Sequence, residues 1–163
     1  MAENLYFVGN FALPSTTNPT AAATVSAVSV QLQLAVASGH QYCLVEYGIS
    51  FAAAPTGALI TLRSTNTAST LSTACMTPTP YNNANAPASS TTTTTATTAF
   101  GTAAVAPAAT VNQVFDAQVL STNTYIKQFP LAREPVLLAS DFLQIVLTAG
   151  LVTTCYCYFI WRE

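Results

Sequence analysis

The sequence predicts an all-β protein, a single-domain antiparallel β-sandwich of jelly-roll or related Greek-key topology. Short stretches in which apolar and polar residues alternate recur at intervals of roughly 10 to 18 residues, and clusters of Ser, Thr, Asn, Gly and Pro separate them. No segment repeats its apolar residues at the 3.6-residue period of a helix. About eight or nine strands without helices are typical of a Greek-key sandwich.

Composition places these strands in one domain with a polar but nearly uncharged surface. The chain has 163 residues, of which 6% are charged, and a formal net charge of -2. An average soluble protein carries about 25% charged residues, so Thr, Ser, Ala, Asn and Gln must cover most of this surface. Surfaces close to neutrality self-associate readily. The 4 Lys and Arg residues are too few for a phosphate-binding stripe, so we expect a protein partner and no nucleic acid.

Residues 1–24 are predicted to form an extended N-terminal arm ahead of a sandwich domain at 25–163. Pro14 and Pro19 disfavour a helix in this arm. The start of the chain lacks the basic and apolar regions of a signal peptide, and no apolar run reaches the roughly 18 residues that span a bilayer. We therefore expect synthesis in a cytoplasm and no membrane partner. The arm has an apolar patch suited to docking on a neighbour, formed by Leu5, Tyr6, Phe7 and Phe11.

Four strands are predicted in the first half of the domain. The strand at 28–36 shows the clearest alternation, with core-facing residues Val28, Val30, Leu32, Leu34 and Val36. The strand at about 41–52 is expected to bury Cys43, Val45, Tyr47, Ile49 and Phe51. Residues 59–63 and 70–76 are predicted to pair as a hairpin.

Residues 77–107 differ sharply in composition, with almost no charge and few large apolar side chains. A long loop inside a compact domain is uncommon and is usually functional or ordered by assembly. The alternatives are a disordered insert, a short edge strand at 91–95 and an O-glycosylated segment.

Further strands are predicted at 111–119, 125–129 and 136–139. In the first of these, alternation places Val111, Phe115 and Val119 on one face and Val114, Asp116 and Gln118 on the other. The chain is then expected to end in a β-hairpin formed by residues 143–148 and 152–161.

The last strand of this hairpin is apolar on both faces. One face, expected to fill the core, carries Cys155, Cys157, Phe159 and Trp161. The other carries Tyr156, Tyr158 and Ile160. Because a two-layer domain has a single core, we expect this second face to pack on another copy of the chain, and the sequence permits the reverse assignment equally.

No group of side chains has the pattern of a catalytic or metal site. His40 is the only histidine, and no nucleophile motif accompanies it. The six carboxylates show no spacing typical of a glycosidase pair. Asp141 is interpreted as a turn residue that accepts hydrogen bonds from nearby backbone N–H groups. We therefore predict a non-enzymatic protein that needs no cofactor and no metal.

The cysteines and the scarce charges each allow two interpretations. The four cysteines are interpreted as buried free thiols, and a bridge from Cys43 to Cys155 or Cys157 is the alternative. Arg133 and Glu134 are either solvated loop residues or an intersubunit ion pair that sets register. The same two interpretations apply to Arg162 and Glu163.

Five motifs together resemble small structural proteins of tailed bacteriophages. They are Glu46-Tyr47-Gly48-Ile49-Ser50-Phe51, Thr77-Pro78-Thr79-Pro80, Phe129-Pro130-Leu131-Ala132-Arg133-Glu134-Pro135-Val136, Ala139-Ser140-Asp141-Phe142-Leu143 and Trp161-Arg162-Glu163. The resemblance covers about two-thirds of the chain, and Arg162 stands where the family more often has Glu.

This resemblance implies a jelly-roll or related protein on the capsid surface of the virion. Such proteins decorate the capsid or cement its subunits, often as homotrimers, so the implied partners are further copies of the chain and the major capsid protein. The expected oligomer interface comprises Tyr156, Tyr158, Ile160, Arg133 and Glu134, and the expected capsid-docking arm comprises Leu5, Tyr6, Phe7 and Phe11.

A carbohydrate- or receptor-binding module of a tail fibre or secreted lectin is the alternative function. A β-sandwich serves both roles, so the fold does not separate them. A sugar site needs exposed aromatic side chains near polar groups, and the candidates are Tyr81, Phe100 and Tyr125.

Overall fold

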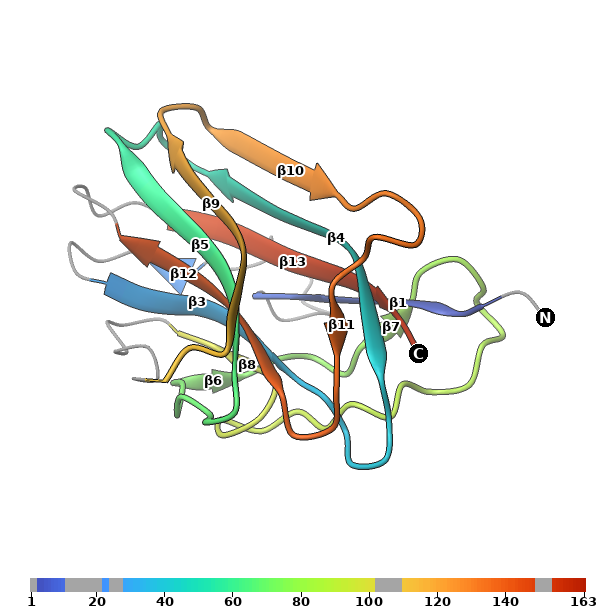
Figure 1. Cartoon of the computed structure of the whole chain (residues 1–163). Coiled ribbons are helices and arrows are strands. Elements are labelled where there is room, and N and C mark those ends of the chain that lie inside the picture. The colour runs from blue at the N-terminus through green and yellow to red at the C-terminus, as the bar shows by residue number, and fades with distance from the viewer. Residues whose placement is uncertain (1–2, 11–21, 24–27, 102–109, 149–153) are drawn as a thin grey trace, which may run out of the picture.

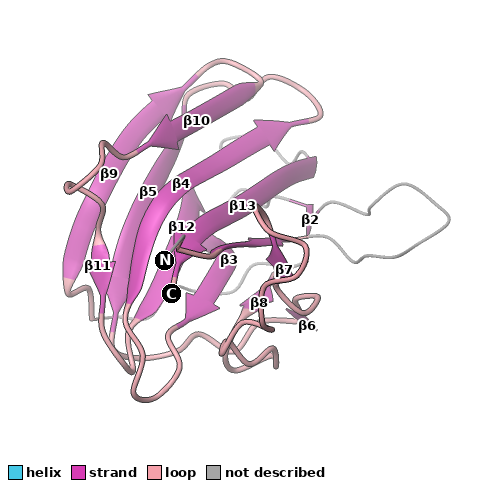
Figure 2. Cartoon of the chain, turned by 90° about the vertical axis from the view of Figure 1, so that its right-hand side faces the viewer, coloured by secondary structure: helices cyan, strands magenta, loops and turns pink. Residues whose placement is uncertain are grey.

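The chain forms a two-layer β-sandwich, as the sequence predicts. The computed structural model describes residues 3–10, 22–23, 28–101, 110–148 and 154–163. This described part contains thirteen strands and no helix, and the strands form two antiparallel sheets that pack face to face (Figures 1 and 2).

The first layer is a seven-stranded sheet with β13 near its middle. Its main order is β10 (Thr124–Gln128), β4 (Tyr42–Phe51), β13 (Thr154–Arg162), β1 (Leu5–Gly9) and β7 (Thr79–Pro80). Two short strands join it from the side: β11 (Val136–Leu137) pairs with β4, and β2 (Ala22–Ala23) pairs with β13.

The second layer is a six-stranded sheet. Its order is β6 (Thr73–Ala74), β8 (Ala99–Phe100), β3 (Val28–Ala35), β12 (Phe142–Thr148), β5 (Ala58–Thr65) and β9 (Gln113–Leu120).

Two predicted hairpins are wrong because strands that follow each other in the chain pair elsewhere. β12 lies between β3 and β5, whereas β13 lies between β4 and β1 in the opposite sheet. β5 likewise pairs with β12 and β9 and not with β6. β12 and β13 are both strongly apolar, and each satisfies its backbone hydrogen bonds with a neighbour on both sides.

The inward face of β13 fills the core as predicted. Its four inward residues are fully buried: Cys155, Cys157, Phe159 and Trp161. The Trp161 ring packs between Tyr6 and Tyr42, with ring centroids 6.0 and 5.8 Å away. Aromatic side chains from β1, β4 and β13 therefore form one end of the core.

β-Bulges overturn the predicted facing of residues in β3 and β4. In β3 the pairing with β12 shifts at Gln31, so Val30 leaves the main core and packs with Leu71, Ala99 and Val146 outside it. In β4 the pairing with β13 shifts at Val45, so Tyr42 and Leu44 are buried in the core in place of Cys43 and Val45. An extra residue in one strand reverses the alternation beyond it, because side chains repeat every two residues.

A third bulge overturns the predicted facing of β9. The pairing with β5 shifts at Phe115, so Asp116 pairs with the core residue Leu62 and points into the sandwich. Val119, predicted to share a face with Phe115, is instead 69% exposed.

All four cysteines are free thiols. Cys155 and Cys157 are buried as predicted, and so is Cys75, whereas Cys43 is only partly buried. The bulge in β4 separates Cys43 from the core face on which Cys155 and Cys157 lie.

Part of the predicted N-terminal arm is incorporated into the seven-stranded sheet. β1 pairs with β13 along five residues, and β2 extends the same pairing further along β13. The Asn10 side chain secures the end of β1, because its amide donates to the Cys155 carbonyl and its oxygen accepts from the Cys157 N–H.

The described part of the predicted loop at residues 77–107 is attached to the sandwich by hydrogen bonds. It contributes β7 to one sheet and β8 to the other, and residues 91–95 form no strand. The Tyr42 hydroxyl lies 2.7 Å from the hydroxyls of both Ser90 and Thr91, and Thr98 accepts a bond from the Ala35 N–H. Residues 102–107 of the predicted loop lie outside the described residues.

Asp116 joins the two sheets at the edge formed by β9 and β10. Its carboxylate accepts hydrogen bonds from the hydroxyls of Tyr47 at 2.7 Å and Tyr125 at 2.8 Å, and from the Gln118 amide, and it pairs with Lys127 at 3.1 Å. Burial raises the pKa of Asp116, but these donors outweigh it and lower the pKa to about 2. Burial and the carboxylate raise the pKa of Tyr125 to about 12.

A buried polar network lies on the outer face of the six-stranded sheet, which is the face that points away from the core between the sheets. Gln144 donates to Gln33 Oε1 at 2.8 Å, and Gln33 accepts from the Ser69 N–H and donates to the Thr97 carbonyl. Arg63 donates to Gln144 Oε1. The sequence predicts a polar outer face for β3, but the segments around Ser69 and Thr97 cover it, so Gln33 and Gln144 are fully buried.

Candidate functional site

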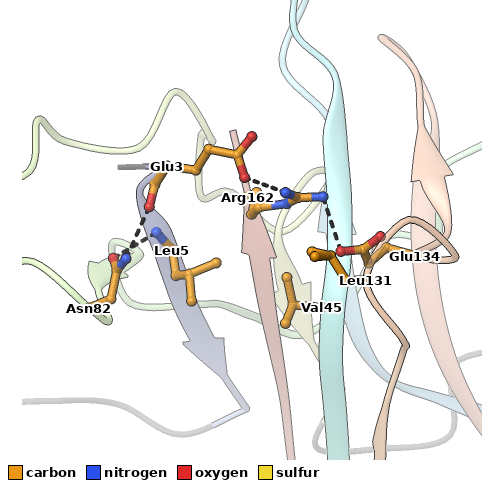
Figure 3. A pocket seen from close by; sticks show the side chains of 7 residues that line it. All are labelled: Glu3, Leu5, Val45, Asn82, Leu131, Glu134 and Arg162. Atoms are coloured by element: carbon orange, nitrogen blue, oxygen red, sulfur yellow. Dashed lines mark hydrogen bonds and ion pairs between the residues drawn. The ribbon is translucent and has the colours of Figure 1, made fainter. Parts of the chain in front are cut away.

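The outer face of the seven-stranded sheet has a pocket where the two ends of the described chain meet. The Arg162 pocket, as we call it, has a volume of about 310 Å³ (Figure 3). Three of its lining side chains are aliphatic and four are charged or polar: Leu5, Val45, Leu131, Glu3, Asn82, Glu134 and Arg162.

Arg162 lies between two carboxylates at the top of this pocket. One terminal nitrogen of its guanidinium pairs with Glu3 and the other with Glu134 at 3.0 Å (Figure 3). Its Nε is buried and has no hydrogen-bond partner among the described residues. The hydrogen bond to Glu3 raises the pKa of Arg162; burial alone would lower it, and the nearby Glu134 charge raises it further.

Four separate parts of the chain hold these groups in place. Arg162 is the last residue of β13, and its partner in the sheet is Leu5 at the start of β1. Asn82 secures this corner, because its oxygen accepts from the Leu5 N–H at 2.8 Å and its amide donates to the Glu3 carbonyl. Glu134 comes from the segment that precedes β11.

An aromatic row adjoins the pocket on the same face. The Phe7 ring lies 5.6 Å from the Tyr158 ring and 6.5 Å from the Tyr81 ring, with interplanar angles of 27° and 21°. Tyr81 is 60% exposed. Tyr158 lies over Gly48 of the neighbouring strand and donates to Glu46.

Replacing Gly48 by Ala is expected to displace the Tyr158 ring. A Cβ at this position would lie 2.3 Å from Tyr158 Cε1, so we expect a loss of about 1–3 kcal/mol of unfolding free energy in denaturant titrations. The same substitution in a Tyr158→Ala background should cost much less, because the clash is absent. Equal costs in the two backgrounds would contradict this packing.

The predicted oligomer-interface residues lie on this face but differ in accessibility. Tyr156 and Tyr158 are partly exposed, whereas Ile160 is only 4% exposed and is covered within one chain. Arg133 is exposed, and Glu134 pairs with Arg162 in the same chain. An intersubunit role for these residues stays a prediction.

The predicted capsid-docking residues are divided between the two sides of β1. Leu5 and Phe7 lie on the outer face, at the pocket and in the aromatic row. Tyr6 is buried in the core, and its hydroxyl donates to the Pro87 carbonyl. Phe11 lies outside the described residues.

The remaining residues that the sequence suggests as functional candidates do not lie together in the structure. Of the three aromatic residues proposed for a sugar site, Phe100 is buried in the core and the Tyr125 hydroxyl binds Asp116, so only Tyr81 is well exposed. His40 lies in an exposed turn. Asp141 accepts a bond from the Leu138 N–H, which confirms its interpretation as a turn residue.

Sequence reasoning missed the Glu3–Arg162–Glu134 arrangement. The three residues are remote in the chain, and only the pairing of β1 with β13 brings Glu3 to Arg162. The scarcity of charge was the one available signal, because charged residues that persist in a nearly neutral chain tend to have specific partners.

Comparisons with known proteins add no family to this description. No protein-family model matches the sequence, and no match was found among curated proteins or solved structures. The described part of the chain contains no helix long and apolar enough to cross a membrane. Among the same residues, no three His, Cys, Asp or Glu side chains gather as a metal site would require.

Proposed function

We propose that the protein is a non-enzymatic virion structural protein of jelly-roll type that decorates or cements a phage capsid as a homo-oligomer. The homotrimer and the major capsid protein as partner follow from the resemblance of its motifs. The virion surface is the proposed location, after synthesis in the host cytoplasm.

The exposure of large apolar side chains is the observation that carries this proposal. In the described residues, Leu131 is 81% exposed, and exposed aliphatic side chains occur on both layers: Val28, Leu59, Val114, Val119, Ile126, Val136 and Leu138. Some of them are neighbours: Leu59 and Val119 are cross-strand partners on β5 and β9, and Leu131, Val136 and Leu138 follow one another in one segment. Neighbouring exposed apolar side chains mark sites of association. With so few charges to keep copies apart, a place in an assembly suits this surface.

Four of the five motifs that resemble phage structural proteins lie in or beside the seven-stranded sheet that carries the pocket, whereas the 139–143 motif leads into β12 of the other sheet. The 46–51 motif lies in β4, the 77–80 motif includes β7, and the 129–136 and 161–163 motifs contain Glu134 and Arg162 of the pocket. Remote segments of the chain therefore contribute to one outer surface, which supports a shared binding role for them.

Cryo-electron microscopy of virions assembled with and without this chain tests the proposal. We expect difference density of sandwich shape on the capsid shell, at a fixed number of copies per capsid subunit. Difference density on the tail alone, or none, would contradict the capsid role. A Val119→Asp, Leu131→Asp double variant that folds normally should show lower occupancy.

The aromatic row favours carbohydrate binding as a second candidate function. Tyr81 offers an exposed ring beside the Asn82 amide and the charged groups of the pocket, and sugars stack on such rings. Binding on a glycan array that Tyr81→Ala abolishes and Val119→Ala preserves would favour this function. Location on the capsid shell without glycan binding would count against it.

A further inference from the structure

The side chain of Arg133 has no partner among the described residues of its own chain. Lys127 pairs with Asp116, Arg162 pairs with Glu3 and Glu134, and Arg63 donates to Gln144. Among the four Lys and Arg residues, Arg133 is the one whose side chain has no hydrogen-bond or ion-pair partner in the described part of the chain. It is exposed, and it belongs to the segment that lines the Arg162 pocket.

The Arg162 pocket carries one negative charge in excess. It contains the carboxylates of Glu3 and Glu134 and the guanidinium of Arg162. Glu134 binds Arg162 through Oε1, its side chain is only 5% exposed, and its second oxygen points away from Arg162 (Figure 3). Leu5, Val45 and Leu131 form the remaining wall. A cation on an aliphatic stem therefore complements this pocket better than an anion does.

Exposed aliphatic residues surround this region. A tight turn, in which the Arg133 N–H bonds to the Pro130 carbonyl at 2.9 Å and Ala132 has a φ of 66°, presents Leu131 to solvent. Val136 and Leu138, which follow in the same segment, are also exposed. They provide apolar area next to the charged groups, as the centre of an interface requires.

Arg133 and the Arg162 pocket lie side by side on one surface, and this arrangement favours a two-fold relation between two copies of the chain. When two complementary features are adjacent on one surface, a two-fold axis between them lets each copy give and receive the same contact. Features that generate a ring of three lie on different sides of the subunit instead.

We propose that two copies of this chain associate about a two-fold axis, with Arg133 of each copy bound in the Arg162 pocket of the other. The guanidinium of Arg133 pairs with Glu134 and Glu3 of the second copy, and Leu131, Val136 and Leu138 of both copies close around these pairs. The ion pairs set the register and are required for the contact, because loss of Arg133 leaves the carboxylates of the other copy desolvated and unpaired, and the apolar residues exclude water around them. The contact stands apart from the proposed capsid role and from any three-fold contact.

Sedimentation equilibrium of purified wild-type protein and two variants tests this contact. Arg133→Gln should reduce the mass of the assembly two-fold. The matched control is Gln113→Glu, an exposed change on β9 in the other sheet that alters the net charge by the same amount and should leave the mass unchanged. A wild-type mass no larger than that of Arg133→Gln, or an equal reduction by Gln113→Glu, would overturn the proposal.

A charge exchange tests whether the pocket receives Arg133. Arg133→Glu and Glu3→Lys should each halve the mass, and the double variant should restore it, because the new glutamate of one copy then meets the new lysine of the other. Circular dichroism and thermal unfolding establish that each variant is folded. A folded double variant that stays at half the wild-type mass would exclude the pocket as the receiving site.

Discussion

Replacing Asp116 by Ala is expected to lower the free energy of unfolding by about 3 kcal/mol. The substitution removes the acceptor that the Tyr47 and Tyr125 hydroxyls share and separates Lys127 from its partner. Urea titration of the wild type and the variant measures the loss. Asp116→Asn keeps one acceptor oxygen in nearly the same place, so we expect a smaller loss, of about 1–2 kcal/mol.

The contribution of Asp116 to stability depends on pH in a defined direction. The pKa of its carboxyl is about 2 in the folded protein, below the ordinary value of 3.8 for an aspartate. A lowered pKa means that the folded state binds its proton less readily, so the stabilisation is complete above about pH 4 and is lost as the pH falls toward 2. The difference in unfolding free energy between wild type and Asp116→Asn should shrink over this interval. A difference that stays constant from pH 5 to pH 2 would contradict it.

Replacing Gln33 by Leu should be about as damaging, with a loss of roughly 4 kcal/mol. The change removes an acceptor from the buried Gln144 amide and Ser69 N–H, and a donor from the partly buried Thr97 carbonyl. Hydrogen exchange should show faster opening of the backbone near Ser69 and Thr97 than elsewhere.

Gln113→Leu is the matched control for this prediction. It makes the same change at an exposed position of β9, where we expect an effect within about 0.5 kcal/mol. Similar losses in the two variants would mean that the Gln33 network contributes little beyond the replaced amide itself.

The alternation of apolar and polar residues was enough to predict the fold class. It was not enough to predict which side chains of each strand point into the core, because bulges reverse the alternation. The pattern of β13 placed Phe159 and Trp161 together in the core. This succeeded because the extra residue of the β4–β13 bulge lies in β4, so the alternation of β13 itself is not interrupted. In β4, the extra residue Val45 reverses the alternation, so that Leu44 and not Cys43 lies in the core. A bulge depends on the partner strand, and a single strand's sequence does not contain that information.

The candidate site was less predictable than the fold because its groups converge through strand pairing. The sequence singles out Leu5 as part of a docking arm, and Glu134 and Arg162 as either solvated residues or members of intersubunit ion pairs, but it does not join the three in one site. These residues and Asn82 meet only because β1 lies beside β13 and the 129–136 segment runs along the edge of β4. Likewise, Gln33 looked like a solvent-facing residue, because the segments that cover it come from 36 and 64 positions later in the chain.

The pairing of β1 with β13 also constrains how the protein folds during synthesis. The Arg162–Glu3 contact joins residues 159 positions apart, and β13 supplies the partner for both β1 and β4. Until β13 has left the ribosome, β4 and β1 lack the strand that lies between them, and the edge of each that faces β13 remains unpaired. Folding that waits for such distant contacts is slow and leaves unpaired edges exposed, so this chain should acquire its native structure only once β13 has been synthesised, and it should benefit from chaperones that bind extended segments.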